Sequence, residues 1–273
     1  MAPLDPITKN NVQVVGNPGS ARTIVFVHGF GTDQRAWDAV AAPFLTDFRV
    51  VLLDNVGAGG SAPDAFIQHR YLNLHAYATD LLDVCRALRV EDAVLVAHSV
   101  GAMIGVLAAN TEPARFSRLV LVGASPRYLD EPGYHGGFTK PDLDALYTAV
   151  SSVYPEWADQ FAPLAMGNPD RPQLAQHFAA TLKSIPAQNA LTVLCSIFQS
   201  DHRQDVCKLN KPTLLIQSQQ DVAVPLEVAQ YLNREIRRSH LAVIDATGHL
   251  PHLSAPAAVV AAMRDFVVGS VPA

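Results

Sequence analysis

The sequence predicts an α/β fold in which helices cover both faces of a mostly parallel sheet. Short apolar runs that are typical of strands alternate along the chain with longer segments whose apolar residues recur at helical spacing. Most of these runs are continuously apolar, which is typical of strands buried on both faces, as in a parallel sheet. With 273 residues, of which 49% are hydrophobic and 16% charged, the chain can bury a large core.

The expected strands are short and separated by helical segments. They lie at residues 22–27, 49–53, 93–97, 119–122, 213–217 and 241–244, with a further antiparallel edge strand at 11–16. The expected helices lie at 33–45, 74–88, 100–109, 226–234 and 257–267. Each helix carries an apolar face, and burial of that face against the sheet would supply most of its stability.

The alternation stops between residues 126 and 209. No segment there reads as a strand, and the stretch reads as several short helices interrupted by prolines. We expect a helical lid at 126–209 over an active site, inserted into a core made of residues 1–125 and 210–273. Most aromatic residues of the lid would pack helix on helix, and a minority would line a ligand pocket.

Ser99 lies where an apolar strand ends and a helical sequence begins. The stretch from Ala93 to Met103 has the strand–turn–helix layout of a nucleophile elbow, which holds a serine hydroxyl clear of the sheet. Small residues are needed on both sides of such a turn, and Ala97 and Gly101 provide them, although Ala97 replaces the usual glycine. The alternative is a serine that only caps the N-terminus of a helix.

Asp221 and His249 each come just after an expected strand. Both would therefore lie at the carboxyl edge of the sheet, where ligands bind in open α/β folds. The chain order Ser99, Asp221, His249 is that of the α/β-hydrolases. Two rival acids are less suitable, because Asp54 precedes the serine and Asp245 is too close in sequence to His249 to approach its ring from a separate loop.

A glycine-containing loop follows the strand at 22–27. Gly29 and Gly31 let the backbone turn sharply and expose the amide of Phe30. Together with the amide of Val100, which follows the serine, it would form an oxyanion hole. An ordinary turn at the end of a strand is the alternative interpretation.

Composition excludes several classes of function. The net charge of −5 offers no basic stripe for nucleic acid and little attraction to anionic membranes. No apolar run is long enough to span a membrane, and the first residues lack a signal-peptide pattern. The three cysteines form no Cys-x-x-Cys pair, and the histidines show no metal-ligand spacing. We expect a cytoplasmic protein with reduced thiols and no metal site.

Longer strings are more specific than these short motifs. They lie at 28–34 with Trp37, 50–55, 57–59, 98–100, 102–105, 123–128, 136–138, 161–165, 198–201, 221–225 and 248–252. Together they resemble the small α/β-hydrolases related to the bacterial stress regulator RsbQ and to the plant strigolactone and karrikin-type receptors. The resemblance spans nearly the whole chain, and Val100-Gly101 favours an RsbQ-like member over a plant receptor.

This resemblance implies an α/β-hydrolase core with a four-helix lid, inserted after the sixth strand, and no cofactor. It implies a triad of Ser99, Asp221 and His249. It also implies a hydrophobic cavity, lined by residues such as Phe30, Phe138, Trp157, Phe161 and Phe198. Members of the group hydrolyse esters or enol-ether-linked lactones slowly, and several act as sensors that signal to a protein partner.

We therefore expect a serine hydrolase that cleaves a small hydrophobic ester or lactone through an acyl-enzyme. The alternative is a ligand sensor with slow or single-turnover hydrolysis that signals through a protein partner.

Overall fold

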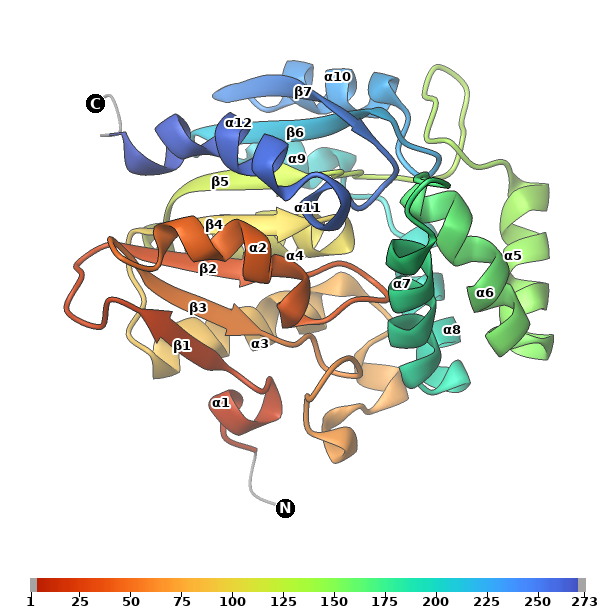
Figure 1. The fold of residues 1–273 in the computed structure, drawn as a ribbon, viewed down its shortest axis with the longest axis horizontal. Coiled ribbons are helices and arrows are strands. Elements are labelled where there is room, and N and C mark those ends of the chain that lie inside the picture. Colours follow the sequence, from red (N-terminus) through yellow and green to blue (C-terminus); the bar gives the residue numbers. More distant parts are fainter. Residues whose placement is uncertain (1–3, 270–273) are drawn as a thin grey trace.

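A single seven-stranded sheet organises the described part of the chain, residues 4–269 of a computed structural model (Figure 1). The strands are β1 (Gln13–Gly16), β2 (Thr23–Val27), β3 (Arg49–Leu53), β4 (Ala93–His98), β5 (Phe116–Val122), β6 (Thr213–Gln220) and β7 (Ser239–Thr247). Their spatial order is β1-β3-β2-β4-β5-β6-β7, and β1 alone is antiparallel to its neighbour. The predicted mostly parallel α/β fold with an antiparallel N-terminal edge strand is therefore confirmed.

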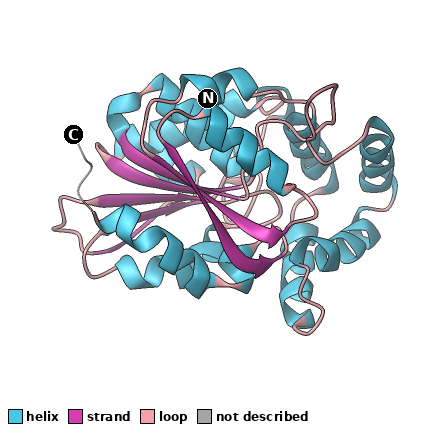
Figure 2. Ribbon diagram, turned by 90° about the horizontal axis from the view of Figure 1, so that it is seen from above, coloured by secondary structure: helices cyan, strands magenta, loops and turns pink. Residues whose placement is uncertain are grey.

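Helices cover both faces of this sheet (Figure 2). One face is covered by α3 (Leu74–Ala87), α4 (Val100–Thr111), α9 (Arg203–Lys208) and α10 (Leu226–Glu235), and the other by α2 (Asp38–Ala41), α11 (Pro251–Ser254) and α12 (Pro256–Val268). The remaining helices of the core are α1 (Pro6–Lys9) and the short 3-10 helices η1 (Gln34–Trp37), η2 (Ala42–Phe44), η3 (Pro63–Ala65), η4 (Gln68–Arg70) and η5 (Pro113–Arg115).

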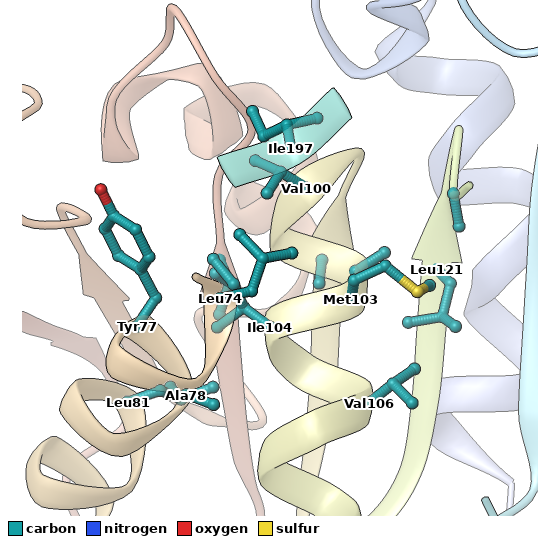
Figure 3. Close-up of a cluster of buried hydrophobic side chains, with 14 of the residues drawn as sticks. Leu74, Tyr77, Ala78, Leu81, Val100, Met103, Ile104, Val106, Leu121 and Ile197 are labelled. Carbon is teal, nitrogen blue, oxygen red and sulfur yellow. The ribbon is translucent and has the colours of Figure 1, made fainter. Parts of the chain in front are cut away.

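The central strands show why their sequences are apolar without alternation. All five residues of β2 are buried, and successive side chains enter opposite layers. Val25 and Val27 pack in the layer below α3 and α4, whereas Ile24 and Phe26 pack in the layer below α2 and α12. Figure 3 shows part of the first layer, where side chains of α3 and α4 meet over the sheet.

The segment between β5 and β6 contributes no strand to the sheet. It forms four helices of 12 or 13 residues, α5 (Lys140–Ser152), α6 (Tyr154–Met166), α7 (Pro172–Ser184) and α8 (Ala187–Phe198). Figure 1 shows them beyond the carboxyl ends of the parallel strands, apart from the helices that cover the sheet. We call α5 to α8 the inserted helices.

Two expectations need correction in detail. The inserted helices follow β5, the fifth strand of the described chain rather than the sixth. A single antiparallel strand, β1, comes before the first parallel strand, β2. The helix expected at 33–45 is divided into η1, α2 and η2, and Pro43 lies in the last of these, where it cannot donate a helical hydrogen bond.

None of the helices within residues 4–269 combines the length and the apolar character that crossing a membrane requires.

Candidate active site

Ser99 occupies a sharp turn between β4 and α4. Its backbone has φ 53° and ψ −122°, a strained conformation for a residue with a side chain. The turn is tightly enclosed, since a Cβ at Gly101 would lie 2.6 Å from the carbonyl oxygen of His28. This close approach is the physical reason for the small residue two positions after the serine.

The structure brings the side chains of Ser99, His249 and Asp221 together in one hydrogen-bonded line. His249 Nε2 lies 2.8 Å from Ser99 Oγ, and His249 Nδ1 lies 2.9 Å from Asp221 Oδ2. With Nδ1 donating to the carboxylate, Nε2 is the nitrogen that accepts from the serine hydroxyl. The ring is therefore held in the tautomer that a general base needs.

Asp221 is kept ionised by its surroundings. Burial raises the pKa of this carboxyl, but the His249 ring and the donating amides of Ala223 and Val224 outweigh burial and hold the pKa below its ordinary value. Those amides lie 2.9 and 3.0 Å from Asp221 Oδ1, and Gln217 Nε2 donates to Oδ2 at 3.1 Å. A carboxylate with this many donors can hold a neighbouring imidazole in place without taking its proton.

Phe30 and Val100 come from two segments near Ser99: Phe30 lines the same cavity as Ser99, and Val100 directly follows it in the chain. Val100 is the first residue of α4, and the first amides of a helix have no acceptor within it. Within residues 4–269 the Phe30 N–H has no hydrogen-bond acceptor, so both amides are free to bind an oxyanion. The loop of Phe30 is ordered by His28, whose Nε2 accepts from the Asn55 amide at 2.9 Å.

One cavity, with about 540 Å³ of space including the part open to solvent, adjoins Ser99 and His249. All five residues expected in a pocket line it, namely Phe30, Phe138, Trp157, Phe161 and Phe198. Several of these rings also contact one another: Trp157 and Phe161 are stacked at a centroid distance of 4.9 Å, and Phe138 and Phe198 meet edge to face at 5.0 Å. The cavity is thus apolar except at the end that holds the serine and the histidine.

Sequence reasoning missed Tyr128 as a site residue. Its hydroxyl lies 3.2 Å from Ser99 Oγ, and burial raises the pKa of the phenol, so the hydroxyl stays protonated. Its position in the long loop after β5 offered no local signal beyond the string at 123–128. Four apolar residues of the inserted helices were not predicted as site residues, because their spacing is that of ordinary packing residues. They line the cavity in the structure: Leu146, Phe178, Leu194 and Ile197.

The inserted helices contact the backbone of the site directly. The amide of His249 donates to the Ala165 carbonyl near the end of α6 at 2.7 Å. Asn168, just after α6, donates to the Thr247 carbonyl at 2.9 Å. At the oxyanion loop, Gly31 has φ 78°, and a Cβ there would lie 2.5 Å from the Leu182 side chain of α7. The position of these helices is therefore linked to the histidine and to the oxyanion loop.

Two further buried histidines lie behind His249. His98 Nε2 donates to the His249 carbonyl at 2.7 Å, and the His98 ring packs against His252 in a tilted arrangement with a centroid distance of 4.2 Å. Burial lowers the pKa of His98 and brings the pKa of His252 to about 3, so both rings are neutral at pH 7. His98 thus fixes the backbone of His249 and has no direct contact with the serine hydroxyl.

Asp54, a rival acid in the sequence, has a different role. Its carboxylate accepts from the amides of Gln34 and Gly60 and from the Asn11 side chain, which ties three loops together.

Comparison with known proteins gives consistent results. The sequence model of the alpha/beta hydrolase fold matches residues 22–256. The Karrikin insensitive 2 receptor CA of Petunia hybrida is 41% identical over 252 residues, which cover 92% of this chain and 93% of the relative. The strigolactone esterase D14 of Arabidopsis thaliana is 40% identical over 260 residues, which cover 93% and 94%. These relatives confirm the resemblance to the plant receptors.

A solved structure is similar over the same extent. The hydrolase olei00960 from Oleispira antarctica superposes with a TM-score of 0.93 at 29% identity, and the match covers 97% of each chain.

Proposed function

Because this chain belongs to the alpha/beta-hydrolase family, it is an ester-hydrolysing serine hydrolase, and we propose that Ser99, His249 and Asp221 are its catalytic triad. The observation that carries this assignment is the line of hydrogen bonds from Ser99 Oγ through His249, at 2.8 Å, to Asp221, at 2.9 Å. Its substrate is a small hydrophobic ester or lactone.

In the proposed reaction, Ser99 Oγ attacks the carbonyl carbon while His249 Nε2 takes the hydroxyl proton. The carbonyl oxygen becomes an oxyanion, which the amides of Phe30 and Val100 stabilise by donating hydrogen bonds. The intermediate collapses to an acyl-serine, and the imidazolium returns the proton to the leaving alkoxide. Water then attacks the acyl group with His249 as base, which releases the acid and restores Ser99. Asp221 holds the ring and stabilises its charge.

The cavity beside Ser99 supports a small hydrophobic substrate. Its aromatic walls would bury a ligand mainly through apolar contact, with few polar groups to direct it. The two plant relatives are named for a strigolactone and for a karrikin response, and a hydrophobic ester or lactone for this chain is in keeping with those names.

We further propose that α5 to α8, within residues 126–209, act as a lid on a core made of residues 1–125 and 210–273 together with α9, which covers the sheet. The inserted helices supply Trp157, Phe161 and Phe198 to the cavity, and the end of α6 accepts a hydrogen bond from the His249 amide. The three cysteines are unpaired, which suits a reducing compartment, and we propose that the protein acts in the cytoplasm.

The test is the hydrolysis of p-nitrophenyl acetate by the wild-type protein and by Ser99→Ala. We expect the substitution to lower kcat by roughly 10⁴- to 10⁶-fold, because without the nucleophile only binding and the oxyanion hole remain. Ser200→Ala, which alters a half-buried serine outside the cavity, is the matched control and should keep the wild-type rate. Wild-type activity in Ser99→Ala would refute the assignment.

A second function is supported by the contact between α6 and the His249 loop. In this proposal the protein is a ligand sensor: hydrolysis is slow or stops after one turnover, and a change in the inserted helices signals to a protein partner. Turnover, ligand-dependent thermal shift and ligand-dependent partner capture distinguish the two. Fast multiple turnover with no ligand-dependent partner favours a plain esterase.

A further inference from the structure

A second cavity lies next to the one that contains Ser99. It holds about 370 Å³ of space, part of which is open to solvent, and it shares with the first cavity only one of the described residues, Phe30. Four parts of the chain line it: the loop after β2, the loop after β3, the helices α3 and α4, and the inserted segment through Ile185, just after α7, and Val193 of α8. Because Phe30 borders both spaces, a molecule in the second cavity would lie beside the oxyanion loop without contacting Ser99.

Tyr77 is one of the lining residues of this mainly apolar cavity, and it carries a buried hydroxyl. The residue is 4% exposed, and within residues 4–269 its hydroxyl has no hydrogen-bond partner. Figure 3 shows the ring extending from α3 with the hydroxyl at its outer end. Burial raises the pKa of the phenol, so the group remains a hydrogen-bond donor at neutral pH. An unpartnered donor at this depth favours a ligand that brings an acceptor.

His28, which also lines this cavity, cannot serve as a hydrogen-bond donor to a ligand. His28 Nδ1 donates to the Gly29 carbonyl at 2.7 Å, and His28 Nε2 accepts from the Asn55 amide at 2.9 Å. Burial lowers the pKa of His28, so its ring is neutral and both nitrogens are occupied. The cavity therefore offers an incoming ligand apolar walls, such as Val100 and Ile104, and the Tyr77 hydroxyl.

We propose that this cavity is a second binding site, for a separate small molecule that is mainly apolar and carries one hydrogen-bond acceptor. A cyclic ketone, a lactone or a cyclic ether has this chemistry. Its oxygen accepts from Tyr77 Oη–H, and its ring fills the space between Val100, Ile104 and Val193. Charged molecules are disfavoured, because none of the described residues that line the cavity carries a charge that could pair with them.

The experiment is a titration with cyclohexanone, followed in ¹³C-methyl NMR spectra of the whole protein. Two groups of methyls report on the two cavities separately. Ile104, Ile185 and Val193 line the second cavity, whereas Leu146, Leu194 and Leu250 line the first. We expect saturable shifts in the first-named group. Cyclohexanone is not hydrolysed, so this result is independent of whether Ser99 is the nucleophile.

Two variants test the two parts of the site. Tyr77→Phe keeps the ring and removes the donor, and it should weaken cyclohexanone binding at the second cavity about 3- to 10-fold, as expected for one lost hydrogen bond. Binding of benzene, which has no carbonyl oxygen, should be unchanged by the same substitution. Val193→Phe should fill the space and abolish the shifts of Ile104 and Ile185 for both probes. Binding at the first cavity serves as the internal control.

Three results would overturn the proposal. One is the absence of saturable shifts at Ile104, Ile185 and Val193, which would mean that the cavity holds only water. Another is equal cyclohexanone affinity in the wild type and Tyr77→Phe. The third is binding that persists in Val193→Phe. If Val193→Phe fails to fold, the comparison of the two probes in Tyr77→Phe still decides the question.

Discussion

The core and the inserted helices contribute to the site in different ways. In the core, polar groups are held by hydrogen bonds at defined atoms: Asp221 accepts from two amides and one side chain besides His249. In the inserted helices, the cavity wall is built from rings that contact one another, such as Trp157 and Phe161. A hydrogen-bonded group is sensitive to the loss of one atom, whereas a packed wall responds in proportion to the area removed. The two regions should therefore respond differently to substitution.

The largest effect should come from Asp221→Asn in the core. The amide would favour the wrong tautomer of His249 and remove the charge that stabilises the imidazolium, so we expect kcat to fall by about 10⁴-fold. Asp64→Asn, on an exposed residue of η3, is the matched control and should leave kcat unchanged. Steady-state hydrolysis of p-nitrophenyl acetate measures both. A loss smaller than 10-fold would show that the carboxylate does not orient the base.

In the inserted helices, Phe161→Ala should have a moderate effect on binding. The ring is half-buried and lines the cavity, so its removal should raise KM for an apolar ester by roughly 10-fold or more, since one large apolar contact is lost. Leu164→Ala, on the same helix but 64% exposed, should change neither KM nor stability.

The competing view of Phe161 is that it only packs the helices together. Truncation would then lower the free energy of unfolding by about 3–5 kcal/mol. Chemical denaturation beside the kinetics separates the two views. An unchanged KM with a large loss of stability would remove Phe161 from the pocket.

Lowering the pH should destabilise the core, which contains the buried neutral histidines, more than the inserted helices. Burial holds the pKa of His252 at about 3 and lowers the pKa values of His28 and His98, whereas His177, the one histidine of α5 to α8, is exposed. In the unfolded chain these groups titrate near pH 6.5, so between about pH 6.5 and 3 the unfolded state binds protons that the folded state does not. Stability is thus lost as the pH falls below about 6.5.

His252→Phe tests this pH dependence. Each such histidine can lower the free energy of unfolding by up to about 1.4 kcal/mol per pH unit as the pH falls. Between pH 7 and 5 the free energy of unfolding should therefore decrease less in the variant than in the wild type. Urea denaturation at the two pH values measures the difference. An identical pH dependence in both proteins would mean that His252 is not held neutral by the fold.

Tyr128→Phe should have the smallest effect of the series. Its hydroxyl contacts Ser99 Oγ at 3.2 Å but is not part of the line through His249, so we expect kcat/KM to fall only about 2- to 10-fold. A loss above 100-fold in the same assay would make Tyr128 a participant in the chemistry and would extend the hydrogen-bonded site into the loop after β5.

The sequence could predict the core better than the inserted helices for a physical reason. Ser99, Asp221 and His249 each follow a strand, and parallel strands bring their carboxyl ends to one edge, so a local pattern fixes a global position. The side chains of the inserted helices depend on where those helices lie, which no local pattern determines. Leu146 and Phe178 thus had the same apolar spacing as ordinary packing residues.

Tyr128 and the second cavity illustrate the same limit. The contact between Tyr128 and Ser99 joins residues 29 positions apart, and Tyr128 lies in a loop without regular structure after β5. In the sequence, Tyr77 is one more residue on the apolar face of α3. That its hydroxyl has no partner among the described residues depends on how the surrounding loops fold, which the local sequence does not show.

The most direct test of the catalytic assignment is labelling with phenylmethylsulfonyl fluoride, followed by peptide mass spectrometry and the p-nitrophenyl acetate assay on the same samples. A serine hydroxyl activated by His249 should form a stable sulfonyl ester at Ser99. Activity should then fall in proportion to the labelled fraction, and Ser99→Ala and His249→Ala should not be labelled at that position. Full activity in protein whose Ser99 is completely sulfonylated would contradict the proposed mechanism, as would inactivation with the label on another residue.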